Sequence, residues 1–152
     1  MRKNLGSSIS QMTELELSIP PLPRFAATAR SALARFGSTH RVAPSDVENL
    51  VFALGEAVAN AIAHAHTAKA IHIRFCLNGA NIVVTITDHG RGFESPSQDA
   101  ISLPSVFAED GRGFAIMQRC TDFLEVDSRL GRGTTVRLGR RLGSRQEPQA
   151  VW

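Results

Sequence analysis

The sequence predicts an α/β fold, specifically a two-layer α+β sandwich in which helices pack on a β-sheet. Apolar residues recur at helical spacing through residues 47–65, and strand-like segments lie before and after that run. The later strand-like segments come in pairs, separated by the turn residues Asn78-Gly79 and by residues 131–133. With 152 residues, the chain is long enough for one domain with a proper core.

The composition is that of a soluble globular protein, with 43% hydrophobic and 20% charged residues. No run approaches the roughly 18 apolar residues that a membrane span needs. No apolar segment follows Arg2 and Lys3, as it would in a signal peptide. We therefore expect a cytoplasmic protein with no membrane partner. Cys76 and Cys120 lie in apolar segments without metal-ligand spacing, and we expect both to fill the core.

The first elements are a strand and a helix that follow a polar N-terminus, residues 1–12, which we expect to be flexible. Apolar and polar residues alternate from Leu15 to Ile19, which predicts a half-buried strand that the following prolines end. Apolar residues from Phe25 to Phe36 then recur at helical spacing, and Gly37 is the expected end of this helix.

The next helix has the clearest signals in the chain. Ser45 and Glu48 form a capping-box pattern at its start. One continuous apolar stripe follows, formed by Val47, Leu50, Val51, Leu54, Val58, Ala61, Ile62 and Ala65. Two strands are predicted after the helix, one beginning at Ile71 and one over residues 82–87, where β-branched residues are frequent.

The remaining elements are a helix and two short strands. Residues 94–110 have no strong period, so we expect a loop there. A helix is predicted over residues 113–121, and strands over residues 123–126 and 134–138. We expect one domain at residues 13–139 and a basic, flexible tail at residues 140–152. No aromatic residues are interleaved with the arginines of this tail, so we expect no direct contact with nucleic acid.

Glu56 and Asn60 are candidates for chemistry because they are four residues apart and share one face of the long helix. A solvated polar face is the usual explanation of such a pair. Asparagine has a poor helix propensity, however, which indicates that another role keeps Asn60 there. Small neighbours also leave room for a ligand to approach; these are Ala53, Ala57, Ala59 and Ala63.

Asp88 and the glycines near it form a second group of candidates. Asp88 ends a predicted strand, where Asp and Gly are also common as simple turn residues. The functional interpretation is that its carboxylate accepts a hydrogen bond from a base, while Gly90 and Gly92 remove side chains that would collide with the ligand. Gly111 and Gly113 are equally ambiguous, because glycine suits a helix start but also lets free N–H groups bind phosphate.

His64 and His66 are weaker candidates for a metal site. They are two residues apart on a helix, so they do not share a face, and no third ligand is evident. We expect them to be polar residues at the end of the helix.

Four short segments occur in a specific order: Glu56-Ala-Val-Ala-Asn60-Ala-Ile-Ala-His64, Asp88-His-Gly-Arg-Gly-Phe93, Gly111-Arg-Gly-Phe-Ala-Ile-Met117 and Gly133-Thr134-Thr135. With these segments the chain resembles the GHKL ATPase superfamily and, within it, the bacterial anti-sigma factor serine/threonine-protein kinases. They look like the N-box, the box that meets adenine, the glycine-rich end of the nucleotide lid and the final box of that family. The resemblance implies a Bergerat-type ATP-binding fold, with helices on one face of a mixed, mostly antiparallel sheet.

The resemblance also implies roles for individual residues. Glu56 would be the general base that takes the proton from a serine hydroxyl. Asn60 would coordinate Mg²⁺, which bridges the phosphates of ATP. The other residues would bind the nucleotide, ATP or ADP: Asp88 at the adenine amino group, Gly90 and Gly92 close to the base, Gly111, Arg112 and Gly113 around the phosphates, and Thr134 or Thr135 under the adenine.

Two functions are consistent with this resemblance. The first is an ATP-dependent serine protein kinase and anti-sigma factor that phosphorylates a STAS-domain anti-sigma factor antagonist and sequesters a sigma factor, with a homodimer as a further expectation. The alternative is a non-catalytic ATP-binding scaffold that binds a STAS or phosphatase partner. The retained Glu56 and Asn60 favour catalysis. The short segment between Phe93 and Gly111, and the lack of a phospho-accepting histidine domain, argue against a sensor histidine kinase.

Overall fold

The structure, a computed structural model, describes residues 12–93 and 112–143. The strands are β1 (Thr13–Ile19), β2 (Ile71–Leu77), β3 (Asn81–Asp88), β4 (Phe123–Arg129) and β5 (Gly133–Arg141). The helices are η1 (Pro23–Phe25), α1 (Ala26–Thr39), α2 (Pro44–His64) and α3 (Arg112–Cys120). None of these helices combines the length and the apolarity that crossing a membrane requires. The predicted loop at 94–110, and most of the predicted N-terminal segment and tail, lie outside the described residues.

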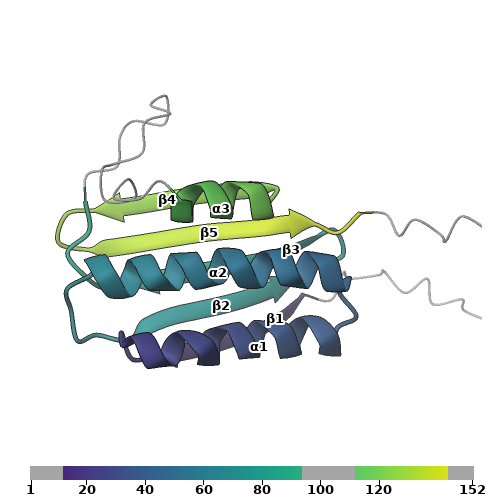
Figure 1. Ribbon diagram of the computed structural model, residues 1–152, viewed down its shortest axis with the longest axis horizontal. Coiled ribbons are helices and arrows are strands. Elements are labelled where there is room, and N and C mark those ends of the chain that lie inside the picture. Colours follow the sequence, from purple (N-terminus) through teal and green to yellow (C-terminus); the bar gives the residue numbers. More distant parts are fainter. Residues whose placement is uncertain (1–11, 94–111, 144–152) are drawn as a thin grey trace, which may run out of the picture.

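The five strands form one sheet in the order β1-β2-β3-β5-β4, and each neighbouring pair is antiparallel. The helices α1, α2 and α3 lie side by side over one face of this sheet, with α2 in the middle (Figure 1). The predicted two-layer α+β sandwich is therefore confirmed, and the described sheet is antiparallel throughout.

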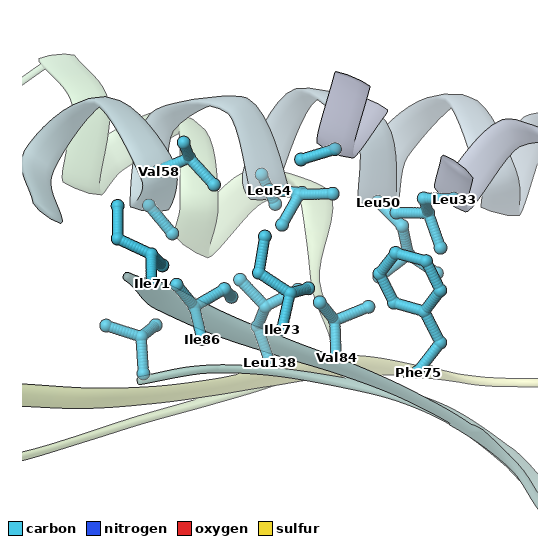
Figure 2. Packing of buried hydrophobic residues seen from close by; sticks show 14 of the residues in the cluster. Leu33, Leu50, Leu54, Val58, Ile71, Ile73, Phe75, Val84, Ile86 and Leu138 are labelled. Carbon is cyan, nitrogen blue, oxygen red and sulfur yellow. The ribbon is translucent and has the colours of Figure 1, made fainter. Parts of the chain in front are cut away.

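The core lies between α2 and the central strands. Leu50, Leu54 and Val58 of α2 are fully buried, as the predicted stripe requires. Figure 2 shows these side chains pointing from α2 toward the sheet, where Ile73, Val84 and Ile86 lie. Burying a side chain of this size stabilises the fold by roughly 1.5–3 kcal/mol. This packing therefore determines where α2, and with it the candidate residues on its other face, lies over the sheet.

Gly37 does not end its helix, contrary to the prediction. The helix α1 continues to Thr39, and Gly37 is buried within it. A Cβ atom at this position would collide with the side chain of Val47 in α2. The absence of a side chain therefore serves the close approach of α1 and α2, and it does not terminate the helix.

The predicted capping box at the start of α2 is also wrong. The N-cap residue is Ala43, which makes no side-chain capping bond, and a proline stands in the first turn. A proline at that place has a backbone already suited to a helix start, so the helix begins before Ser45. Ser45 lies inside the helix, where its carbonyl accepts a hydrogen bond of 3.0 Å from the side chain of Asn49.

The strand β5 continues through Arg141, past the predicted end of the domain at residue 139. Arg140 and Arg141 lie opposite Ile82 and Asn81 of β3 in the sheet. Arg140 also forms an ion pair with Asp46. The first residues of the predicted tail are therefore part of the fold, because a run of arginines does not reveal which of them pair with other elements.

Candidate functional site

A cavity of about 170 Å³ lies between the C-terminal half of α2 and the sheet. Its walls come from α2, from the end of β3 with the segment after it, and from the start of β5. The lining residues are Ala57, Asn60, Ala61, His64, Ala65, His66, Ile86, Asp88, Arg91, Gly92, Phe93, Thr134 and Val136. Apolar walls with a few convergent polar groups are typical of a small-molecule site. Four predicted site residues are brought together here, namely Asn60, Asp88, Gly92 and Thr134.

Asp88 is the buried acid of this cavity and is only 7% exposed. Its Oδ1 accepts a hydrogen bond of 3.0 Å from the N–H of Gly90, and the backbone N–H of Thr134 also bonds to the carboxyl group. Burial raises the pKa of Asp88 above its usual range, while those two N–H groups and the nearby His89 oppose the rise. A carboxyl group held in this way can accept a hydrogen bond from the amino group of a ligand.

Asn60 brings an unpaired polar group to the same cavity. Its Nδ2 atom is buried and has no hydrogen-bond partner among the residues that the structure describes. A buried group without a partner costs roughly 1–3 kcal/mol. An acceptor on a ligand, such as a phosphate oxygen, would remove this cost. The environment of Asn60 is therefore not the solvated face that was the alternative explanation.

Glu56 does not line the cavity but lies beside it, at the start of α3. A Cβ atom at Gly113 would be 2.8 Å from Oε2 of Glu56, so the carboxylate lies directly against the first turn of α3. Since Glu56 and Asn60 are one helical turn apart on α2, the cavity and the start of α3 are adjacent. Gly111 lies outside the described residues, and only the backbone of Arg112 is described.

The two candidate threonines lie on opposite faces of β5. Thr134 lines the cavity, and its hydroxyl oxygen is 2.7 Å from that of Ser128. Thr135 faces away, with its hydroxyl oxygen 3.3 Å from that of Thr87. Successive side chains of a strand point to opposite faces, so only one of the two can reach the cavity. That residue is Thr134.

Gly92, which lines the cavity, and Gly133, next to the lining residue Thr134, lie where the segment after β3 crosses the turn before β5. Both have positive φ angles, +64° at Gly92 and +89° at Gly133. A Cβ atom at Gly92 would collide with the carbonyl of Arg129, and one at Gly133 with the carbonyl of Asp88. At both positions, the collision that glycine avoids is thus with the protein's own backbone.

The end of α2 is joined to the segment after β3. The carbonyl of Ala65 accepts a hydrogen bond of 3.0 Å from the N–H of Arg91. A Cβ atom at Gly90 would collide with Ala65, so this glycine serves the contact between the two segments and does not line the cavity. His66 has a φ of +49°, in the left-handed region, where the chain leaves the helix.

Several cavity residues were not predicted, namely His64, His66, Arg91 and Phe93. The two histidines were expected only as polar residues at a helix end, and residue 91 had no expected role. His64 follows Asn60 by one helical turn, which is the one local signal that could have found it. Arg91 and Phe93 lie on either side of Gly92 in the Asp88–Phe93 segment, which was singled out without a role for either side chain, and His66 lies just beyond the helix end.

The arrangement can bind a nucleotide. Ala57, Ala61 and Phe93 give the cavity an apolar wall suited to a flat ring, and the carboxyl group of Asp88 is an acceptor beside that wall. The amide of Asn60 can offer an oxygen ligand to a hard cation such as Mg²⁺ and an N–H group to a phosphate. The residues present therefore fit both an adenine nucleotide and its magnesium ion.

Residues 19–140 match a known family, the histidine kinase-like ATPase domain. The chain is 32% identical over 121 residues to the anti-sigma F factor of Thermoanaerobacter sp. (strain X514), a match that covers 76% of this chain and 85% of that protein. It is 27% identical over 135 residues to the anti-sigma F factor of Bacillus subtilis (strain 168), covering 85% of this chain and 92% of the relative. The matched residues include the whole cavity.

Two solved structures share the fold. The RsbU and RsbW domains of a Mycobacterium tuberculosis protein match with a TM-score of 0.67 at 22% identity, covering 86% of this chain but 32% of that one. The histidine kinase domain of a blue-light activated histidine kinase from Erythrobacter litoralis matches with a TM-score of 0.52 at 20% identity, covering 82% of this chain and 62% of that one. At these identities the likeness concerns the fold.

Proposed function

The chain belongs to the histidine kinase-like ATPase domain family, in the group of anti-sigma factor kinases of the GHKL superfamily, and from this premise we propose that it is an ATP-dependent serine/threonine-protein kinase and an anti-sigma factor. Its substrate is a serine on a STAS-domain anti-sigma factor antagonist, and its second partner is a sigma factor that it sequesters in the cytoplasm. Relatives named anti-sigma F factor, matched over most of their length, support this assignment.

The observation that carries the proposal is the placement of two polar groups on one face of α2. Asn60 lines the cavity, and its buried Nδ2 has no partner among the described residues, while Glu56 holds its carboxylate against the first turn of α3. A nucleotide with its base in the cavity and its phosphates toward α3 would lie next to both the Asn60 amide and the Glu56 carboxylate. Binding alone needs only the cavity, whereas transfer to a hydroxyl also needs a proton acceptor beside the phosphates.

The cavity binds and orients the nucleotide. The carboxylate of Asp88 accepts a hydrogen bond from the adenine amino group. The hydroxyl of Thr134 lies on the sheet side of the same cavity and is the group there that can bind the base directly or through water. The small residues Ala57 and Ala61 leave the space that the flat ring occupies.

The phosphates lie between Asn60 and the start of α3. Bound Mg²⁺ supplies positive charge that offsets the charge of the phosphate oxygens. Asn60 would hold this ion through its side-chain oxygen, and its Nδ2 would be available to donate a hydrogen bond to a phosphate oxygen. The backbone N–H groups of the first turn of α3, where Gly113 lies, would add further donors for phosphate.

Glu56 takes up the proton that the reaction releases. As the serine oxygen of the antagonist forms its bond to the γ-phosphorus, the bond from that phosphorus to ADP breaks, and the hydroxyl proton passes to the carboxylate of Glu56. The products are phosphoserine and ADP. Proximity to α3 keeps the carboxylate next to the transferred group.

The test is phosphate transfer from labelled ATP, with Mg²⁺, to each STAS protein of the same genome. We expect phosphoserine on one of them. Glu56→Gln should abolish transfer while nucleotide binding persists, and Glu48→Gln, at an exposed position on the same helix, is the matched control with full activity. Full activity of Glu56→Gln would exclude Glu56 as the base. Nucleotide binding without transfer to any STAS protein would favour the non-catalytic scaffold that binds a STAS or phosphatase partner.

A further inference from the structure

Arg140 joins three elements near the N-terminal end of α2. Its Nε donates a hydrogen bond of 2.6 Å to Oδ1 of Asp46, in the first turn of α2. Its Nη1 donates a hydrogen bond of 3.1 Å to the carbonyl oxygen of Cys120, the last residue of α3. Arg140 itself belongs to β5. These three residues are called the Arg140 clamp below.

The Arg140 clamp is largely removed from water. The side chains of Arg140 and Asp46 are 22% and 16% exposed, whereas those of the pair Arg137 and Glu125 are 49% and 67% exposed. A largely buried pair is screened less by salt, and loss of one partner leaves the other charge uncompensated. The Cys120 carbonyl is one of those that a helix end leaves without a partner within the helix, and a cation is favoured there.

Two contacts together set the register of α2 and α3. At one end the Arg140 clamp brings Asp46 of α2 to Cys120 of α3. At the other end Glu56 of α2 meets Gly113 of α3. The two helices are therefore antiparallel. With a rise of about 1.5 Å per residue, about 15 Å of α2 and about 10 Å of α3 separate the two contacts.

The clamp differs in kind from the apolar packing of α3 and from two hydrogen bonds near its C-terminal end. Met117 is fully buried, but the hydrophobic attraction that buries it is not directional. The hydroxyl of Thr121 bonds to the Met117 carbonyl at 2.6 Å, and the N–H of Asp122 bonds to the Gly139 carbonyl at 2.8 Å. Those bonds link α3 to its own turn and that turn to β5. The Arg140 clamp is directional and links α3 to α2.

We propose that Arg140 is a positioning residue for phosphate transfer. By holding Asp46 and the Cys120 carbonyl, it fixes the register of α2 and α3 and keeps the first turn of α3 beside Glu56. The inference rests on the proposed function, because it assigns that register to the transfer step. The adenine cavity lies at the C-terminal half of α2 and does not depend on the clamp.

The test compares substitutions at two neighbouring arginines. Arg140→Met keeps an unbranched side chain without the charge, and Arg140→Lys supplies a single charged group that cannot span two acceptors as a guanidinium does. Arg141→Gln is the control, because Arg141 is exposed and its bond to Asp122 comes from the backbone N–H. In Arg140→Met we expect kcat for transfer to fall at least tenfold, with adenosine affinity within twofold of wild type. For Arg140→Lys we expect a kcat between those of Arg140→Met and wild type. For Arg141→Gln we expect the kcat of wild type.

A second measurement does not use catalysis. Amide hydrogen exchange over residues 112–116 should become faster in Arg140→Met than in Arg141→Gln, because the first turn of α3 is released. Unchanged kcat, unchanged exchange, or a loss of adenosine affinity equal to the loss of kcat would overturn the proposal. If the wild-type protein transfers no phosphate, the role of Arg140 in transfer fails together with the proposed function. The amide hydrogen exchange over residues 112–116 then tests only whether Arg140 fixes the register of α2 and α3. Should Arg140→Met fail to fold, Asp46→Asn, which weakens the ion pair from the other side, takes its place.

Discussion

The carboxylate of Glu56 occupies space that exists because residue 113 is a glycine: a Cβ atom there would be 2.8 Å from Oε2 of Glu56. The two residues belong to different helices, α2 and α3. The contact is made by the tip of a flexible side chain against backbone, so it can be disturbed without unfolding the core. It therefore offers a way to change catalysis and stability separately.

Gly113→Ala should lower phosphate transfer without lowering stability. The added methyl group meets Oε2, which can rotate away at small cost, and alanine is favoured over glycine in a helix by about 1 kcal/mol. In the proposed mechanism the displaced carboxylate would no longer lie where the proton is released, and we expect kcat to fall on the order of tenfold or more. Transfer assays and thermal unfolding measure the two effects. A clear drop in Tm would show that the position serves packing instead.

Asn60→Ala should weaken binding of Mg²⁺-nucleotide while leaving folding stability nearly unchanged. The substitution removes a buried Nδ2 that has no partner among the described residues. Its lost packing is therefore offset by relief of a desolvated group, and we expect the free energy of unfolding to stay within about 1 kcal/mol of wild type. Denaturant unfolding and calorimetric titration with MgADP test this.

The control for Asn60 is Asn49→Ala on the same helix. The amide of Asn49 donates a hydrogen bond of 3.0 Å to the Ser45 carbonyl, far along α2 from the cavity. This variant should keep nucleotide affinity. A strong loss of stability in Asn60→Ala would contradict the interpretation, because it would mean that the amide makes a stabilising bond in solution.

The stability of the ligand-free protein should depend on pH through Asp88. Burial raises its pKa above the ordinary value of 3.8. The folded state then binds the proton more tightly than the unfolded state does. The stabilisation of the folded state by protonated Asp88 is complete below that ordinary value. It is lost as pH rises through the raised pKa of Asp88 in the folded protein.

Asp88→Asn removes this titration. The variant should therefore gain stability relative to wild type as pH increases from below 3.8 into the neutral range. Its adenosine affinity should fall, because an amide offers one acceptor oxygen where the carboxylate offers two. Unfolding by denaturant at a series of pH values tests the expected gain in stability of Asp88→Asn. A stability difference between the two proteins that does not change with pH would refute it.

Thr134→Val should weaken adenosine binding, and Thr135→Val should not. Each substitution removes one hydroxyl group at nearly constant volume, but only Thr134 lines the cavity. The expected loss is about 1 kcal/mol, which is several-fold in the dissociation constant. Calorimetric titration with adenosine measures both variants. Equal losses would show that the effect passes through the stability of β5 and not through contact with the base.

The order of the elements could be predicted because local periodicity determines it. The apolar stripe that contains Leu50, Leu54 and Val58 predicted the buried face of α2 correctly, since burial follows the helical repeat. Grouping Asn60 with Asp88 needed more than periodicity. It came from the order of the four motifs, and the structure brings both residues to one cavity.

The remaining features depend on contacts between segments that are far apart in the chain. Gly37 is a residue type that often ends a helix, but here a glycine is needed because the side chain of Val47 in the neighbouring helix leaves no room for a Cβ atom. Arg140 lies in a basic segment that resembles a tail, but its partner Asp46 lies 94 positions away in the chain. The choice between Thr134 and Thr135 needed the register of β5 against the sheet. Patterns within one segment carry no information on such partners.

The crossing of backbone at Gly92 and Gly133 limits how this site can change during evolution or engineering. Any side chain at either position pushes on a carbonyl of the crossing segments, which at Gly133 is that of Asp88. We therefore expect a substitution at either glycine to disturb the fold and the shape of the cavity together. A library selected only for soluble expression should be depleted of variants at both glycines. Changes in ligand preference are therefore expected at lining residues away from this crossing, such as His64 on α2.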